Sequence, residues 1–122
     1  MTCFDDRLRV YAVAGLADAA AASSAKGGVT KEATAACTIR HCTQTGRWVV
    51  PFRACWTAGG DALVCGGMKR TCEVFDAASG APLASLADDK MTAIPSRNAV
   101  HREGSTVACA TNSGRIHLFA HA

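Results

Sequence analysis

The chain alternates between short apolar runs and polar segments that contain glycine, asparagine, aspartate or serine. The apolar runs are only a few residues long. They are rich in β-branched residues or alternate apolar with polar positions, which is typical of strands rather than helices. From this pattern we predict strands at residues 52–57, 62–66, 71–76, 83–87, 96–100, 106–110 and 115–119.

An internal repeat connects these strands. A shift of 44 residues brings Leu63-Val64-Cys65 onto Val107-Ala108-Cys109 and Cys72–Phe75 onto Ile116–Phe119, with no gap. Each copy has about four strands, and a repeat of about 40–45 residues with four strands is the size of one β-propeller blade. We therefore predict an all-β fold, a partial WD-repeat propeller of about two to three four-stranded antiparallel blades. The alternative is an ordinary β-sandwich in which the repeat arose by chance.

The repeat also predicts how the chain is divided. At 44 residues for each blade, 122 residues cover fewer than three blades, and a ring closes with about four to eight. We therefore expect an arc of a larger propeller, and the sequence leaves open whether this arc is a truncated product that cannot fold alone. We predict four units: the end of a preceding blade at 1–14, an inserted loop at 15–36, a blade with a basic loop at 37–82, and a final blade at 83–122. The inserted loop is rich in Ala, Ser and Gly, and the alternative is that it contains a short helix at Leu16–Ala22.

Positive charge is concentrated in one part of the chain. The formal net charge is +3, and residues 40–70 carry five bases and one acid, which is +4, so the other residues nearly cancel. No amphipathic basic helix accompanies this window, so it suits a polyanion better than a membrane surface. The alternative is a solvated face on a slightly basic protein. No apolar run is long enough to cross a membrane, and no signal peptide is recognisable, so we expect no membrane partner.

Sequence motifs for catalysis or metal binding are missing. The seven cysteines contain no C-x2-C pair and mostly lie in apolar runs, so we expect reduced thiols that pack as small core residues in a nuclear or cytosolic protein. There is no G-x-S-x-G and no phosphate-binding loop with adjacent Gly-Lys-Thr. His117 alternates with apolar neighbours on a predicted strand, so we expect it to face solvent or an adjacent blade and not a metal. We therefore predict no enzyme, no catalytic residue, no metal site and no cofactor.

The basic window contains a candidate nucleic-acid site. In a propeller, the connection from the outermost strand of one blade to the next blade emerges on the same face as the turn between the second and third strands. An aromatic ring beside a guanidinium, as in Arg47-Trp48, can insert into a groove or stack on bases while the arginine contacts phosphate. The alternative is that Trp48 packs back onto the blade. The predicted DNA-binding residues are Arg40, Gly46, Arg47, Trp48, Lys69, Arg70 and Arg115.

Several segments resemble one known family. The run Thr45–Trp56 resembles the loop-and-strand signature of the family of WD repeat-containing protein 76 and DNA damage-binding protein 2. The segments Asp5–Tyr11, Val64–Met68 and Asn112–Phe119 are similar to other parts of its C-terminal blades. The resemblance covers nearly all of the chain except residues 15–36. It implies a seven-bladed propeller in the nucleus that binds duplex DNA, with a preference for lesions in some members and a role in DNA repair.

The resemblance also implies partners. Some members are substrate receptors of a cullin-type ubiquitin ligase, and a hairpin tip that corresponds to Gly46, Arg47 and Trp48 inserts into the minor groove. This chain has Arg-Trp at that tip and not the wedge residues of the damage-binding relative, so the resemblance implies groove insertion and leaves the lesion preference open. The Trp-Asp-x-Arg motif for the ligase adaptor is incomplete at Phe75–Ala78 and at Tyr11–Ala14. Chromatin proteins or the adaptor would therefore bind through blades outside this chain. The alternative function is a protein-interaction scaffold or ligase substrate receptor without direct DNA contact.

Overall fold

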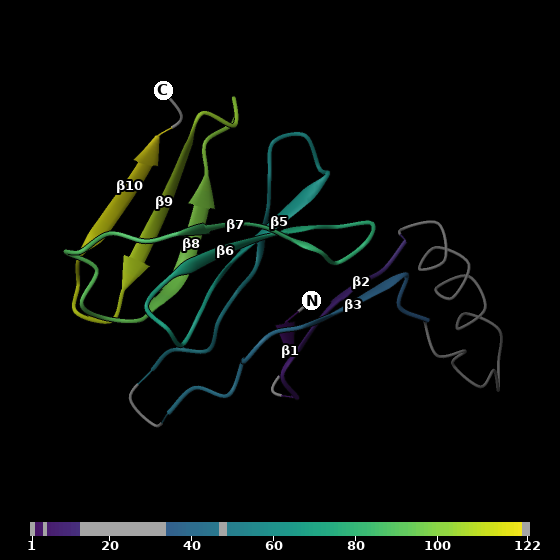
Figure 1. Ribbon diagram of the computed structural model, residues 1–122, viewed down its shortest axis with the longest axis horizontal. Coiled ribbons are helices and arrows are strands. Elements are labelled where there is room, and N and C mark those ends of the chain that lie inside the picture. Colours follow the sequence, from purple (N-terminus) through teal and green to yellow (C-terminus); the bar gives the residue numbers. More distant parts are fainter. Residues whose placement is uncertain (1, 4, 13–33, 47–48, 121–122) are drawn as a thin grey trace, which may run out of the picture.

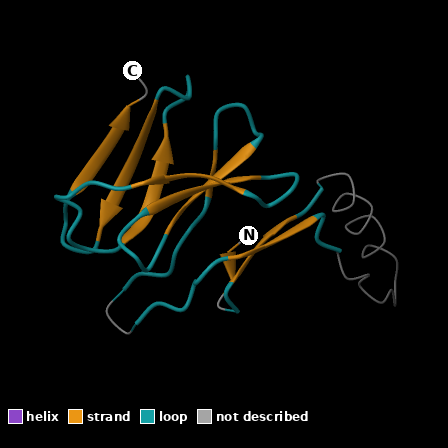
Figure 2. Cartoon of the chain, in the orientation of Figure 1, coloured by secondary structure: helices purple, strands orange, loops and turns teal. Residues whose placement is uncertain are grey.

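The computed structural model describes residues 2–3, 5–12, 34–46 and 49–120. Within these residues the only regular elements are strands, as Figure 2 shows. No helix in this part of the chain is long and apolar enough to cross a membrane. Most of the predicted insert at 15–36, including the alternative helix at Leu16–Ala22, lies outside the described residues.

The strands form three antiparallel sheets that follow one another along the chain (Figure 1). The first sheet has the order β1 (Thr2–Cys3), β2 (Arg7–Val10) and β3 (Cys37–Arg40). The second has the order β4 (Cys55–Trp56), β5 (Ala62–Gly66), β6 (Cys72–Asp76) and β7 (Pro82–Leu86). The third has the order β8 (Pro95–Val100), β9 (Thr106–Thr111) and β10 (Ile116–Ala120). This arrangement confirms the all-β class with antiparallel, blade-like sheets. Among the described residues only the second sheet has four strands.

The repeat of 44 residues is visible in the strand registers. Leu63 lies opposite Phe75 in the second sheet, and Val107 lies opposite Phe119 in the third. The turn before β9 also copies the turn before β5, because Gly60 and Gly104 both have positive φ, of 72° and 73°. Each of the sequence repeats 37–82 and 83–122 contains the last strand of one sheet and the first three strands of the next.

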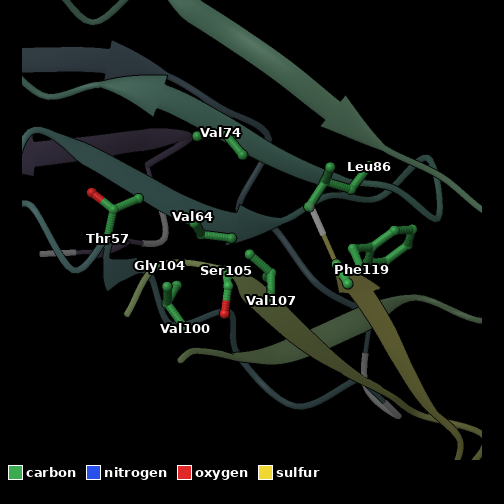
Figure 3. Close-up of a pocket in the computed structure, with 10 residues that line it drawn as sticks. Thr57, Val64, Val74, Leu86, Val100, Gly104, Ser105, Val107 and Phe119 are labelled. Atoms are coloured by element: carbon green, nitrogen blue, oxygen red, sulfur yellow. The ribbon is translucent and has the colours of Figure 1, made fainter. Parts of the chain in front are cut away.

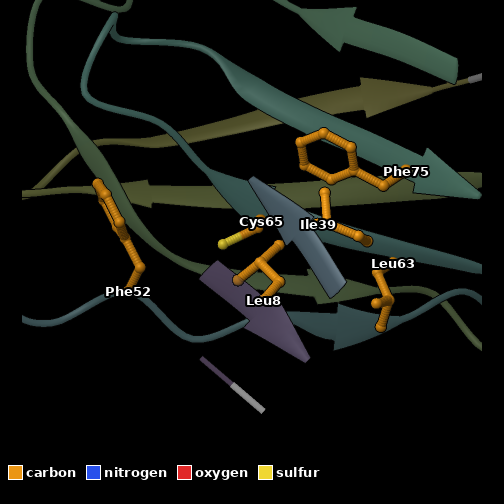
Figure 4. Close-up of a cluster of buried hydrophobic side chains, with 6 residues drawn as sticks. All are labelled: Leu8, Ile39, Phe52, Leu63, Cys65 and Phe75. Carbon is orange, nitrogen blue, oxygen red and sulfur yellow. The ribbon is translucent and has the colours of Figure 1, made fainter. Parts of the chain in front are cut away.

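Both faces of β5 are buried, because the second sheet lies between the other two. Leu63 and Cys65 point toward the first sheet, and the intervening Val64 points toward the third. Figure 4 shows the cluster between the first and second sheets. It consists of Leu8, Ile39, Phe52, Leu63, Cys65 and Phe75. The cluster between the second and third sheets consists of Val64, Cys72, Met91 and Cys109.

The cysteines whose side chains are described are free thiols, and Cys65, Cys72 and Cys109 belong to these clusters. Burial raises the pKa of the Cys65 thiol from 9.0 to about 12. That rise lowers its reactive thiolate fraction at neutral pH about a thousandfold. Cys42, in contrast, is exposed.

Thiol labelling of the folded chain should therefore be strongly selective. At pH 8 we expect Cys42 to react with an alkylating reagent before any other described cysteine, and Cys65, Cys72 and Cys109 to react only after denaturation. Peptide mass spectrometry at successive times measures the order. The variant Cys42→Ser is the control and should lose the fast phase. Early labelling of Cys65 in the folded protein would contradict the packing of these sheets.

Candidate nucleic-acid interface

One end of the three sheets carries most of the predicted DNA-binding residues, and we call it the turn face. It is formed by the β1–β2, β5–β6 and β9–β10 turns, together with the β3–β4 and β7–β8 connections. Because neighbouring strands run antiparallel, all five of these segments leave their sheets at the same end. Within a sheet, hydrogen bonds join a turn to the neighbouring connection: the backbone N–H of His41 donates to Asp6 O at 3.1 Å, and that of Asn112 donates to Ile94 O at 3.1 Å.

The β5–β6 and β9–β10 turns have the same hydrogen-bonded construction. The N–H of Arg70 donates to Gly67 O at 3.3 Å, and the N–H of Gly114, which is 44 positions later, donates to Thr111 O at 3.0 Å. Asp6 occupies the corresponding place in the first turn. All three residues have positive φ, of 58° at Asp6, 63° at Arg70 and 79° at Gly114. Glycine adopts this conformation at little cost, whereas a residue with a side chain is disfavoured there. Arg70 is therefore held in a position for which the β9–β10 turn uses glycine.

The predicted cations of the turns are exposed. Lys69 and Arg70 lie in the β5–β6 turn and Arg115 lies in the β9–β10 turn, so the structure brings these three to the turn face. Arg40 is also exposed and ends β3, where it lies opposite Arg7. Among the described residues none of these four predicted cations forms an ion pair.

Two acids near this face, Asp5 and Asp88, in contrast, have partners of their own. Asp5 forms an ion pair with Arg9, and the hydrogen bond from Arg9 lowers the pKa of Asp5. Asp88 accepts a hydrogen bond from the Lys90 N–H, and its carboxylate lies 3.2 Å from His117 Nδ1. Both contacts lower the pKa of Asp88, and the contact with Lys90 has the larger effect. The cations of the turns are therefore not neutralised by Asp5 or Asp88 and remain available to a ligand.

The β3–β4 connection is attached to the first turn through Asp6. The carboxylate of Asp6 accepts hydrogen bonds from the N–H of Thr43 at 2.9 Å and the N–H of Gln44 at 3.2 Å. In return, the N–H of Asp6 donates to Thr43 Oγ1 at 3.0 Å. Further along, the N–H of Val49 donates to the carbonyl oxygen of Gly46 at 3.0 Å, and Gly46 is exposed. The predicted groove residues Arg47 and Trp48 lie outside the described residues.

His41 joins the same connection to the second sheet. Its ring is buried, Nε2 donates to Gly66 O at 2.8 Å, and Nδ1 lies 3.2 Å from Glu73 Oε2. The ring also packs against Phe52 and Phe75, with centroid separations of 6.1 and 5.4 Å. Sequence reasoning did not identify His41 or Asp6 as residues that position the loop. The signal for Asp6 was available, because aspartate tolerates positive φ and caps turns.

Neither histidine pairing forms a metal centre. Across the described ranges no group of His, Cys, Asp and Glu side chains is suited to hold a metal ion. What the turn face offers a ligand is therefore positive charge on fixed turns, next to a connection that is anchored at His41 and Asp6.

Several known proteins are similar to this chain in sequence. No protein-family model matches the chain. It is 34% identical to WD repeat-containing protein 76 from Mus musculus over 123 residues, which is 98% of this chain and 18% of that protein. It is 38% identical to the DNA damage-binding protein cmr1 of Aspergillus clavatus over 85 residues, which is 66% of this chain and 16% of that protein. It is 33% identical to the DNA damage-binding protein CMR1 of Cryptococcus neoformans over 126 residues, which is 98% of this chain and 21% of that protein. The chain thus spans about a fifth or less of the length of these relatives.

Proposed function

Because the chain belongs to the family of WD repeat-containing protein 76 and DNA damage-binding protein CMR1, we propose that it is a non-enzymatic, DNA-binding part of a WD-repeat propeller. Its ligand is duplex DNA, intact or damaged, and it acts in the nucleus in the response to DNA damage. Repair of the lesion is the process that this binding serves.

The observation that carries this proposal is the set of exposed cations on the turn face. Lys69, Arg70 and Arg115 come from turns of two different sheets, and within the described residues they have no acidic partner. A duplex presents rows of phosphates that such a surface can neutralise, with release of counterions. Backbone contacts of this kind position a protein on DNA but do not read its sequence.

In the proposed complex, the cations and the loop tip have different roles. Arg40, Lys69, Arg70 and Arg115 contact phosphates. Arg47 and Trp48, which follow Gly46, make the groove contact. A ring that stacks on a base contributes about 1–3 kcal/mol by alanine substitution. The loop tip is therefore expected to contribute more for each residue than a single phosphate contact.

The substitution Trp48→Ala tests this assignment. We expect it to weaken binding of a fluorescent duplex about tenfold in an anisotropy titration, because one stacking contact is lost. Trp56→Ala is the matched control. Trp56 is 50% exposed but ends β4 at the end of the sheet opposite the turn face, so its removal should leave the affinity unchanged. Circular dichroism shows whether each variant is folded.

The same titration separates DNA binding from a scaffold function. If an acidic peptide binds the chain at moderate salt and duplex DNA does not, the turn face serves a protein partner and the proposal is wrong. If the Trp48→Ala protein bound duplex DNA as tightly as the unsubstituted protein, the groove contact by Trp48 would be wrong. The proposed phosphate contacts would not be affected by that result.

A further inference from the structure

The turn between β4 and β5 is held by an acidic side chain as well as by its backbone. The N–H of Thr57 donates to Ala62 O at 2.9 Å, and the N–H of Gly60 donates to Thr57 O at 3.0 Å. In addition, Thr57 Oγ1 donates to Asp61 Oδ1 at 2.8 Å. An anionic oxygen at position 61 therefore connects the last residue of the turn to its first, and we call this contact the cap of the turn.

The β8–β9 turn has the same backbone but a hydroxyl in place of the acid. The N–H of His101 donates to Thr106 O and the N–H of Gly104 donates to His101 O, both at 2.8 Å. Each of these residues is 44 positions after its counterpart, so Ser105 takes the place of Asp61. A phosphate on a serine oxygen carries a charge of about −1.5 to −2 at neutral pH. Phosphorylation of Ser105 would therefore restore an acid to this turn.

Ser105 is accessible and has a basic neighbour at the spacing that one class of protein kinase reads. Residues 101–105 are all exposed. Figure 3 shows Ser105 at an open apolar cavity of about 250 Å³, with its hydroxyl oxygen pointing away from Val64. Arg102 lies three positions before Ser105, and arginine-directed Ser/Thr kinases hold a guanidinium at that position with carboxylates. Exposed turns open at a low cost in free energy, so this segment can extend into a kinase.

One other hydroxyl of the chain has the same spacing, and the structure excludes it. Arg40 lies three positions before Thr43. The Thr43 side chain is buried, with only 3% of the residue exposed, and its Oγ1 accepts a hydrogen bond from the N–H of Asp6 at 3.0 Å. The fold therefore separates two hydroxyls that the arginine spacing alone leaves equivalent.

We propose that Ser105 is a phosphorylation site for an arginine-directed Ser/Thr kinase, and that its phosphate caps the β8–β9 turn as Asp61 caps the β4–β5 turn. In the transfer, Ser105 Oγ forms a bond to the γ-phosphorus of ATP. The bond from that phosphorus to the β,γ-bridging oxygen breaks, and ADP leaves with the electron pair. The hydroxyl proton goes to the catalytic aspartate of the kinase.

The side chains of the β8–β9 turn suit a phosphate. His101 Nδ1 accepts a hydrogen bond from the N–H of Glu103 at 3.3 Å, so the ring proton of the neutral histidine is on Nε2. That N–H and the Arg102 guanidinium can donate to phosphate oxygens, as the Thr57 hydroxyl donates to Asp61. Only the Glu103 carboxylate would repel the phosphate, and because Glu103 is exposed its side chain can turn toward solvent.

Phosphorylation of the intact 122-residue chain tests the proposal. With ATP, Mg²⁺ and activated calmodulin-dependent protein kinase II, we expect one phosphoryl group, which peptide mass spectrometry locates at Ser105. Ser105→Ala should remove the incorporation, and Arg102→Ala should slow it at least about tenfold. The matched control Arg53→Ala removes an exposed arginine outside this turn and should leave the rate within about twofold.

Two synthetic peptides separate the effect of the sequence from that of the fold. Peptides of residues 37–47 and 99–109 should both be phosphorylated, at Thr43 and Ser105, because neither hydroxyl is buried there. In the folded chain only Ser105 should be modified. Phosphorylation of Thr43 in the folded chain, or of Ser105 in the peptide alone, would overturn the proposal.

Hydrogen exchange tests whether the phosphate caps the turn. The amides at positions 101 and 104 make the backbone bonds of the turn, so after phosphorylation we expect them to exchange about fivefold more slowly. The variant His101→Ala should still be phosphorylated but should lose most of this slowing. Equal exchange before and after phosphorylation of the unsubstituted chain would show that the proposed cap does not form.

Discussion

Replacing Gly66 with alanine is expected to destabilise the chain by about 3 kcal/mol, the upper end for an overpacked core position. An added Cβ would lie 1.7 Å from the carbonyl oxygen of Pro95 and 2.8 Å from its carbonyl carbon. Both are backbone atoms at the start of β8, so no side-chain rotation relieves the overlap. The third sheet would have to move away from the second, and Val64, Cys72 and Cys109 would lose contacts.

Urea denaturation followed by circular dichroism measures this effect, and Gly46→Ala is the matched control. Gly46 has no atom within 4 Å of its Cβ position and no positive φ, so alanine there should change the free energy of unfolding by less than about 0.5 kcal/mol. The loss at Gly66 is purely steric for the same reason, because its φ is not positive either. If Gly66→Ala were as stable as Gly46→Ala, the second and third sheets could not pack as closely as the structure shows.

The repeat explains why this glycine has no counterpart in the third sheet. The position 44 residues later is Ala110, which faces the open side of that sheet. A covering strand could not approach Ala110 as closely as Pro95 approaches Gly66. Sequence comparison within the chain identified the repeat, but only the packing of β8 on β5 shows that the glycine is a steric requirement.

The strands were predictable because they depend on local pattern. The predicted strands 62–66 and 106–110 agree with β5 and β9 to within one residue, since alternating apolar runs and glycine-containing turns bound them on both sides. The predicted strand 52–57 is shorter in the structure, where β4 begins at Cys55. Phe52 is instead held by the first sheet, through a hydrogen bond from Thr2 Oγ1 to its carbonyl oxygen at 2.9 Å. A contact between residues 50 positions apart leaves no local signal in the sequence.

The candidate site was predictable only in part, for the same reason. The position of Lys69, Arg70 and Arg115 on one face follows from the order of strands in a blade, and the structure places them there. The anchoring of the β3–β4 connection by Asp6, and the pairing of His41 with Glu73, join residues more than thirty positions apart. The conformation of Arg70 was equally invisible, because arginine gives no sign of positive φ.

Removing the cations of the turns should nearly abolish DNA binding while leaving the fold intact. For the combined substitutions Lys69→Ala, Arg70→Gly and Arg115→Ala we expect about a hundredfold weaker affinity at low salt, at about 1 kcal/mol for each lost contact. The slope of log affinity against log salt should become shallower by about three, because each phosphate contact contributes about one. Anisotropy titrations at several salt concentrations measure both quantities.

The substitution Arg70→Gly is expected to change DNA affinity and the stability of the chain in opposite directions. Glycine suits the φ of 63° better than arginine does, so Arg70→Gly should stabilise the chain by about 1 kcal/mol while it weakens DNA binding. A variant that melts higher and binds worse cannot owe its lower affinity to unfolding. Arg102→Ala is the charge-matched control, because Arg102 lies in the β8–β9 turn at the opposite end of the sheet. If Arg102→Ala weakened binding as much as Arg115→Ala, net charge and not the turn face would account for the affinity.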